Sequence, residues 1–192
     1  MRNGAIVLLF ALPLFARAET PRPSFVVQTG GVVAASLPLA LLDEPDVRRQ
    51  LGSGLTTTFL LFARQRETKI ASAARLEIRY DLWDEVWIVR RIELDGRAQP
   101  ERIPSRELLE KWWKTPVRLL VTQASRLALQ VDLSVLPFSA AEEEDARKWM
   151  SKAGGVGTPG VASTGLVDAL IGTTISAKPI TSYRWSVDLT LR

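Results

Sequence analysis

Residues 80–88 read YDLWDEVWI and contain three aromatic and three acidic side chains within nine positions. In glycosidases, paired carboxylates act as acid, base or nucleophile on a bound sugar, and aromatic rings commonly stack on such sugars. The candidate binding residues are therefore Trp83, Asp84, Glu85 and Trp87. The alternative is structural: Tyr80 and Trp87 are core or cross-strand aromatics, and the acids at 81, 84 and 85 keep a hairpin tip soluble. We favour this alternative because strands ordinarily contain aromatic and β-branched residues.

The chain contains no histidine and no cysteine. This composition excludes Ser-His-Asp and Cys-His nucleophiles, zinc sites of ordinary composition, haem ligation and iron–sulfur clusters. Carboxylate chemistry, a Ser–Lys pair and oxygen-ligated cations remain possible, but Ser151-Lys152 and Ser176 near Lys178 match no spaced motif. The acidic run at 142–145 is typical of the first turn of a helix. We therefore predict no catalytic residue, no metal site and no cofactor.

The first eighteen residues resemble a secretory signal peptide. A basic Arg2 precedes an apolar run, and small residues at 16 and 18 predict cleavage after Ala18. A membrane anchor is the alternative, but the run is short and Pro13 interrupts it. We expect a periplasmic or secreted protein with no later transmembrane segment and no disulfide. Loss of two of the 25 basic residues with the signal lowers the formal net charge from +4 to +2, so we predict no nucleic-acid partner.

The distribution of apolar residues predicts strands in an antiparallel sheet. Apolar and polar residues alternate at 126–136 and 182–192, whereas 56–66 has a continuous apolar centre, typical of a central strand. Within 24–39, Gly30-Gly31 indicates a bulge or a turn. Residues 75–94 predict a hairpin with its tip at 82–85, and the adjacent Arg90 and Arg91 suggest a bulge or an arginine lying along the sheet.

Three segments have the capping pattern of short helices. Asp43 is the expected N-cap of the first and Ser105 of the second, and Ser139 with Glu142 forms a capping box before the third. Residues 153–165 contain five glycines and predict a long flexible loop, either a tether or a functional segment. The predicted fold is α+β: one domain over 19–192, with a mostly antiparallel sheet of about six strands and three or four short helices.

The segments LPLALLDEPDVRRQLGSGLTTTFLLF, RLEIRYDLWDEVWIV, LLEKWW and LALQVDLSVLPFS, in this order, resemble an uncharacterised family of exported bacterial proteins, a domain of unknown function. The resemblance covers about residues 32–140. It rests on a short helix ending in Gly-Leu before an apolar strand, a hairpin near a Tyr-Asp corner and a late strand ending in Leu-Pro. The resemblance implies export and an envelope setting, and it implies no catalytic residue.

Three functions agree with these features. The first is a non-catalytic binding or envelope-associated module whose partner is an envelope protein or ligand. The second is a carboxylate-dependent glycan hydrolase. The third is a carrier of an apolar ligand, whose cavity would be lined by tryptophans at 112, 113, 149 and 185, although aromatic core packing is the commoner role of such residues. The sequence leaves the oligomeric state open.

Overall fold

The computed structural model describes residues 20–67, 70–94, 96, 99–138 and 179–190. The predicted signal peptide, the helix that would begin after Ser139 and the glycine-rich loop at 153–165 lie outside the described residues. Within the described ranges, nine strands and three helices form an α+β fold, as predicted. All strand pairs are antiparallel, and they divide into a six-stranded and a three-stranded sheet.

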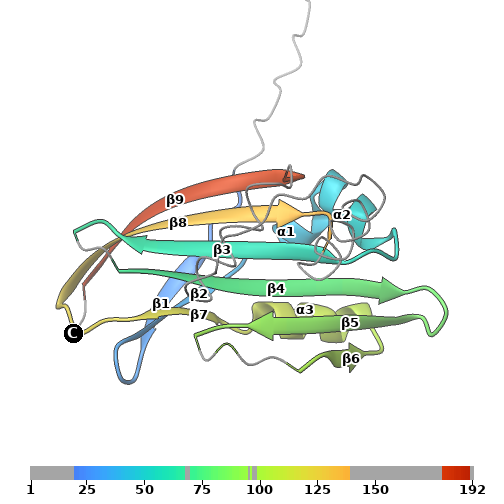
Figure 1. The fold of residues 1–192 in the computed structure, drawn as a ribbon, viewed down its shortest axis with the longest axis horizontal. Coiled ribbons are helices and arrows are strands. Elements are labelled where there is room, and N and C mark those ends of the chain that lie inside the picture. Colours follow the sequence, from blue (N-terminus) through green and yellow to red (C-terminus); the bar gives the residue numbers. More distant parts are fainter. Residues whose placement is uncertain (1–19, 68–69, 95, 97–98, 139–178, 191–192) are drawn as a thin grey trace, which may run out of the picture.

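The larger sheet has the strand order β6-β5-β4-β3-β8-β9 (Figure 1). Its members are β3 (Thr57–Gln65), β4 (Ala71–Asp81), β5 (Val86–Ile92), β6 (Glu101–Ile103), β8 (Arg126–Leu136) and β9 (Thr181–Thr190). Strand β3 lies between β4 and β8, which confirms the central position expected from its apolar run. It buries Phe59 and Leu61 on one face and Leu60 on the other. The alternation in β8 and β9 also gives one buried and one more exposed face, as expected.

The smaller sheet has the order β1-β2-β7, formed by β1 (Ser24–Gln28), β2 (Val32–Ser36) and β7 (Val117–Val121). The expected break at Gly30-Gly31 is the turn between β1 and β2, and both glycines have positive φ. Glycine adopts these angles without the steric cost that a Cβ imposes. A bulge occurs elsewhere, between Val33 and Ala34 where β2 pairs with β7.

The described helices are α1 (Ala40–Asp43), α2 (Pro45–Leu51) and α3 (Arg106–Lys114). The predicted N-cap at Asp43 is wrong, because Asp43 ends α1 and Glu44 occupies the N-cap position of α2 without a side-chain capping bond. Pro45 explains the break, since a proline disfavours helical backbone in the residue before it. The prediction for α3 is confirmed: Ser105 Oγ accepts a hydrogen bond from the Leu108 N–H at 3.3 Å.

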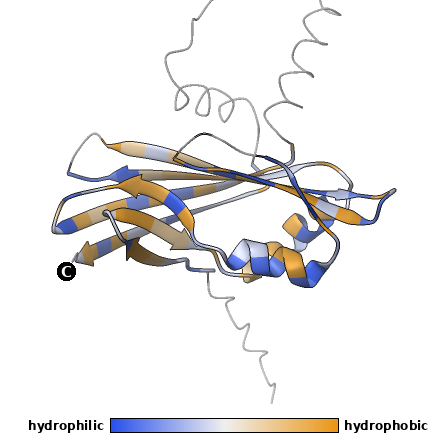
Figure 2. Cartoon of the chain, turned by 90° about the horizontal axis from the view of Figure 1, so that it is seen from below, coloured by the Kyte–Doolittle hydropathy of each residue, from blue (hydrophilic) through white to orange (hydrophobic). Residues whose placement is uncertain are grey.

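The helices and the smaller sheet together cover one face of the larger sheet (Figures 1 and 2). Apolar residues of the helices and of the smaller sheet form a single core with the residues of the larger sheet that face them. Trp113 of α3 is fully buried there, and its ring meets that of Phe59 edge-on at a centroid distance of 4.7 Å. Its indole N–H donates to the Pro38 carbonyl at 3.2 Å. The helices and the smaller sheet therefore pack against one face of the β4–β5 hairpin. The turn of this hairpin lies at one end of the molecule (Figure 1).

Candidate functional site

The predicted hairpin is formed by β4 and β5, and its turn is Leu82–Glu85. The pairing runs without interruption from Arg75 opposite Ile92 to Asp81 opposite Val86. The expected bulge at Arg90 and Arg91 is therefore absent from this ladder. The other expectation is an arginine lying along the sheet. Arg90 reaches Glu77 on the neighbouring strand β4, to which its Nε donates at 2.8 Å, whereas Arg91 leaves the sheet and its guanidinium lies 4.8 Å from the centre of the Trp112 ring of α3.

The backbone of the turn is held by Asp81. Its Oδ1 accepts hydrogen bonds from the N–H groups of Trp83 at 3.0 Å and Asp84 at 3.2 Å. The hydrogen bond from Asp84, and next the one from Trp83, lower the pKa of the Asp81 carboxyl below its usual value. Glu85 completes the turn with φ of +52°, a left-handed conformation that is uncommon outside glycine. The turn is thus fixed by its own side chain as well as by the strands.

The apolar side chains of this turn face solvent. The side chain of Trp83 is 96% exposed and that of Leu82 is 58% exposed. Leu82 lies against Gly54, since a Cβ at Gly54 would be 2.9 Å from Leu82 Cδ1. The residue after Gly54 is Leu55, which is 56% exposed. We call Leu55, Leu82 and Trp83 the tip surface.

A charged pair borders the tip surface. Asp84 of the turn forms an ion pair with Arg102 of β6, and both side chains are largely exposed. The sequence analysis identified Asp84 but missed Arg102 and Leu55. No sequence pattern predicts that these two residues lie near the turn. The strand order β4-β5-β6 brings Arg102 there, and the contact between Gly54 and Leu82 brings Leu55 there.

Trp87, the fourth predicted residue, does not lie with the other three. It is the second residue of β5, opposite Tyr80 on β4, and the two rings are 4.7 Å apart at an angle of 50°. Its side chain is half-buried and packs against the core. The structure therefore places Trp83, Asp84 and Glu85 together in the turn and places Trp87 on the core-facing side of the sheet.

Two buried carboxylates are engaged by arginines rather than by each other. Glu77 Oε2 accepts from Arg90 Nε at 2.8 Å, and Arg75 lies on the same carboxylate. Glu93 accepts from Arg118 Nε at 2.7 Å and from Arg91 at 3.3 Å. Glu77 and Glu93 lie on opposite faces of the sheet, because Glu77 pairs with Arg90 whereas Glu93 contacts Arg91 and β7. Neither arrangement is the pair of facing carboxylates that glycoside hydrolysis uses.

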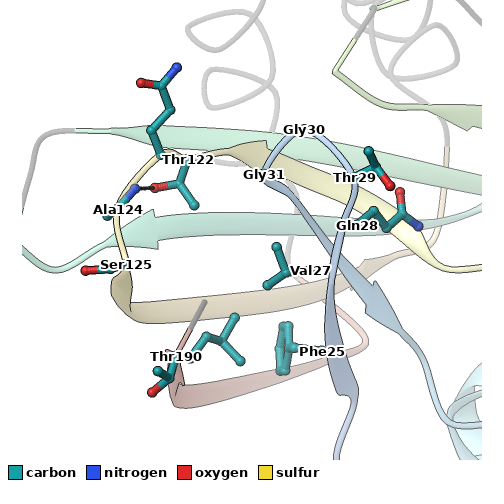
Figure 3. A pocket seen from close by; sticks show the side chains of 12 residues that line it. Phe25, Val27, Gln28, Thr29, Gly30, Gly31, Thr122, Ala124, Ser125 and Thr190 are labelled. Carbon is teal, nitrogen blue, oxygen red and sulfur yellow. Dashed lines mark hydrogen bonds between the residues drawn. The ribbon is translucent and has the colours of Figure 1, made fainter. Parts of the chain in front are cut away.

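A groove opens between the two sheets (Figure 3), at the end of the molecule opposite the hairpin turn (Figure 1). It has a volume of about 1030 Å³. Phe25 and Val27 of β1 point into it, across from Thr190 at the end of β9, and Leu189 of β9 also lines it. The turn at Gly30-Gly31 and the neutral residues 122–125 complete the lining, so the described residues around the groove carry no ionisable side chain.

Of the four tryptophans considered for an apolar cavity, the three that the structure describes do not line this groove. Trp113 is packed in the core, and Trp112 lies under Arg91. Trp185 is buried, stacks with Tyr183 at 5.6 Å and donates to the Pro21 carbonyl. Trp149 lies outside the described residues. The three described rings thus serve packing, while a phenylalanine lines the groove.

Comparison with known proteins found no family model, no curated protein and no solved structure that matches this chain. The resemblance noted over residues 32–140 therefore remains a prediction. In the described part of the chain, no acidic residues gather in a group that could hold a metal ion. None of the helices there is long and apolar enough to cross a membrane.

Proposed function

We propose that this chain is an exported, non-catalytic binding module whose contact residue is Trp83. The observation that carries this proposal is the 96% exposure of Trp83 on a turn fixed by Asp81. An exposed tryptophan offers a large apolar area, and tryptophan is among the residues that contribute most to binding at protein interfaces. Because the turn is already ordered, binding would order little additional backbone.

The chemistry around Trp83 suggests the kind of partner. Leu55 and Leu82 enlarge the apolar area, while Asp84 and Glu85 place carboxylates at its border. An envelope protein that presents an apolar pocket with basic residues at its rim would complement this surface. Arg102 holds Asp84 in place through its ion pair and keeps part of the border neutral.

Export is part of the proposal and is supported by the segment at 1–18. N-terminal sequencing of protein recovered outside the cytoplasm should begin at Glu19. Full-length protein retained in the membrane fraction would contradict cleavage after Ala18.

Site-specific photo-crosslinking tests the binding proposal. A photoreactive phenylalanine analogue at position 83 should form a defined adduct with one envelope protein in cells. The same analogue at Leu108, which is 45% exposed on α3, is the matched control and should give no such adduct. The purified partner should then bind Trp83→Ala at least about tenfold more weakly than wild type, since truncating a tryptophan at a binding hot spot costs about 2 kcal/mol or more. Equal binding by the two proteins would refute the proposal.

The groove supports carriage of an apolar ligand as a second candidate. Its volume of about 1030 Å³ and the apolar side chains of Phe25, Val27 and Leu189 are the observations that favour it. A fluorescent fatty acid should bind the wild-type chain, and Val27→Lys should abolish the signal by placing a charge in the groove. Val26→Lys is the matched control, because Val26 is the neighbouring exposed residue of β1 and does not line the groove. Equal loss in both variants, or no binding by wild type, would exclude this candidate.

A further inference from the structure

Strand β9 is the last strand of the larger sheet, and within the described residues it pairs only with β8 (Figure 1). It contains ten residues and no proline. An edge strand of this length offers a row of backbone N–H and C=O groups to another strand. Natural proteins commonly prevent such pairing with a proline, a bulge, a short edge or charged side chains. In its pairing with β8, β9 has neither a proline nor a bulge nor a short edge, and its charged residues are one of each sign, Arg184 and Asp188.

The side chains of β9 divide cleanly between the two faces of the sheet. The outer face carries Ser182, Arg184, Ser186, Asp188 and Thr190, all of which are exposed. The core-side face carries Tyr183, Trp185, Val187 and Leu189, of which Trp185 is buried and the others are half-buried. The core thus leaves part of this apolar row uncovered along the edge.

We infer that two copies of this chain associate by antiparallel pairing of β9 with β9, with Ser186 opposite Ser186 on the two-fold axis. Directly opposed residues in an antiparallel pair lie on the same face of a sheet. In this register Arg184 faces Asp188 of the second copy, and the pair occurs twice by symmetry. On the other face Trp185 is opposite Val187 and Tyr183 is opposite Leu189, while Ser182 is opposite Thr190.

Charge complementarity selects this register. Centring the pair on Arg184 would oppose two arginines, and centring it on Asp188 would oppose two aspartates. Centring it on Trp185 or Val187 would place Arg184 and Asp188 opposite serine or threonine only. Only the register centred on Ser186 pairs the two opposite charges, and opposite charges across strands stabilise a sheet whereas like charges destabilise it.

The existing contacts of the two charged residues permit the new pair. Asp188 faces Ala128 on β8 and forms no ion pair among the described residues. Arg184 bonds to Asp132 through Nε, which leaves the other guanidinium N–H groups to donate to a second carboxylate. The dimer would join two larger sheets into one continuous sheet across the axis.

Charge exchange tests this arrangement. Sedimentation equilibrium of the purified chain should show a dimer, and Asp188→Arg or Arg184→Asp alone should weaken it at least about tenfold, because each places like charges opposite each other twice. An equal mixture of the two variants should regain the dimer as a heterodimer, since both charge pairs are then restored. A monomeric wild type, or a mixture no more associated than its components, would overturn the inference.

A cysteine at the axis tests the register without altering any charge. The chain has no cysteine of its own. Ser186→Cys should form an intermolecular disulfide on mild oxidation, because opposed Cα atoms in a sheet lie about 4.5–5.5 Å apart, which suits a disulfide. Ser182→Cys is the matched control: it lies on the same face, but its counterpart in the second copy would be about 27 Å away, eight residues along the strand. Crosslinking of both variants to the same extent, or of neither, would contradict this register.

Discussion

Gly31 and Thr122 lie in direct backbone contact where the two sheets open into the groove. The Thr122 N–H donates to the Gly31 carbonyl at 2.9 Å. A Cβ at Gly31 would lie 2.0 Å from the Thr122 carbonyl oxygen, a distance that no real Cβ can occupy. The neighbouring Gly30 has the same left-handed backbone, with φ of +79°, but open space around it.

This difference predicts that two adjacent glycine substitutions have unequal effects. Gly30→Ala should reduce the free energy of unfolding by about 1–2 kcal/mol, the cost of a left-handed backbone for an L-residue. Gly31→Ala should reduce it by more than about 3 kcal/mol, because the backbone contact with Thr122 must also break. Urea denaturation of the two variants measures both values. Equal losses would show that backbone conformation alone matters at this turn.

The two tryptophans of the hairpin should differ in their contribution to stability. Trp83→Ala should change the free energy of unfolding by less than about 0.5 kcal/mol, because the side chain is almost fully exposed. Trp87→Ala should reduce it by about 2–3 kcal/mol, below the 3–5 kcal/mol of a fully buried aromatic, since its ring is half-buried against Tyr80. A destabilised Trp83→Ala would mean that the turn needs the indole for its own fold.

Arg91 should be important for the attachment of α3. Its guanidinium donates to the carbonyls of Trp112 at 2.8 Å and Thr115 at 2.9 Å, at the end of the helix. Arg91→Met keeps much of the apolar stem but removes these donors, and it should cost about 2–4 kcal/mol in thermal or urea unfolding. Arg91→Lys should recover only part of this loss, because one ammonium group lacks the planar set of donors. Full recovery by lysine would show that charge alone is required.

Tyr183 should make stability depend on alkaline pH. Burial, and then its hydrogen bond to Glu44 at 2.7 Å, raises the pKa of the Tyr183 hydroxyl above 10.0. Because the pKa is raised in the folded state, the stabilisation contributed by the protonated Tyr183 hydroxyl is complete below about pH 10. This stabilisation is lost as the pH rises through the pKa of Tyr183 in the folded protein. The difference in urea midpoint between wild type and Tyr183→Phe should therefore shrink above pH 10. If the difference in urea midpoint did not change with pH, ionisation of the Tyr183 hydroxyl would not affect stability, and this prediction would be wrong.

One error of the sequence analysis concerns the residue at which α2 begins. A helix beginning after Asp43 is what local capping preferences favour, but Glu44 lies at the N-cap position and its carboxylate accepts from Tyr183, 139 residues away. A capping preference is a local quantity of about 1 kcal/mol. The proline at 45 overrides it, because a proline disfavours helical backbone in the residue before it.

The sequence by itself determined the features that depend on neighbouring residues. The alternation in β8 and β9, the cap at Ser105 and the hairpin with its turn at 82–85 follow from side-chain periodicity and local hydrogen bonding, and each is confirmed. The exposed position of Trp83 also follows from its place in the turn.

Only the tertiary structure decided what is brought together over long separations in the chain. It divided the strands into two sheets, placed Arg102 and Leu55 beside the turn, and gave Trp87 and Arg91 to the core-facing side of β5. A period of two assigns residues to two faces but cannot say which face the second layer covers when both carry apolar residues. That choice depends on which face α3 and the smaller sheet cover, and the physical reason is the burial of Trp113 against Phe59 on one side of the larger sheet.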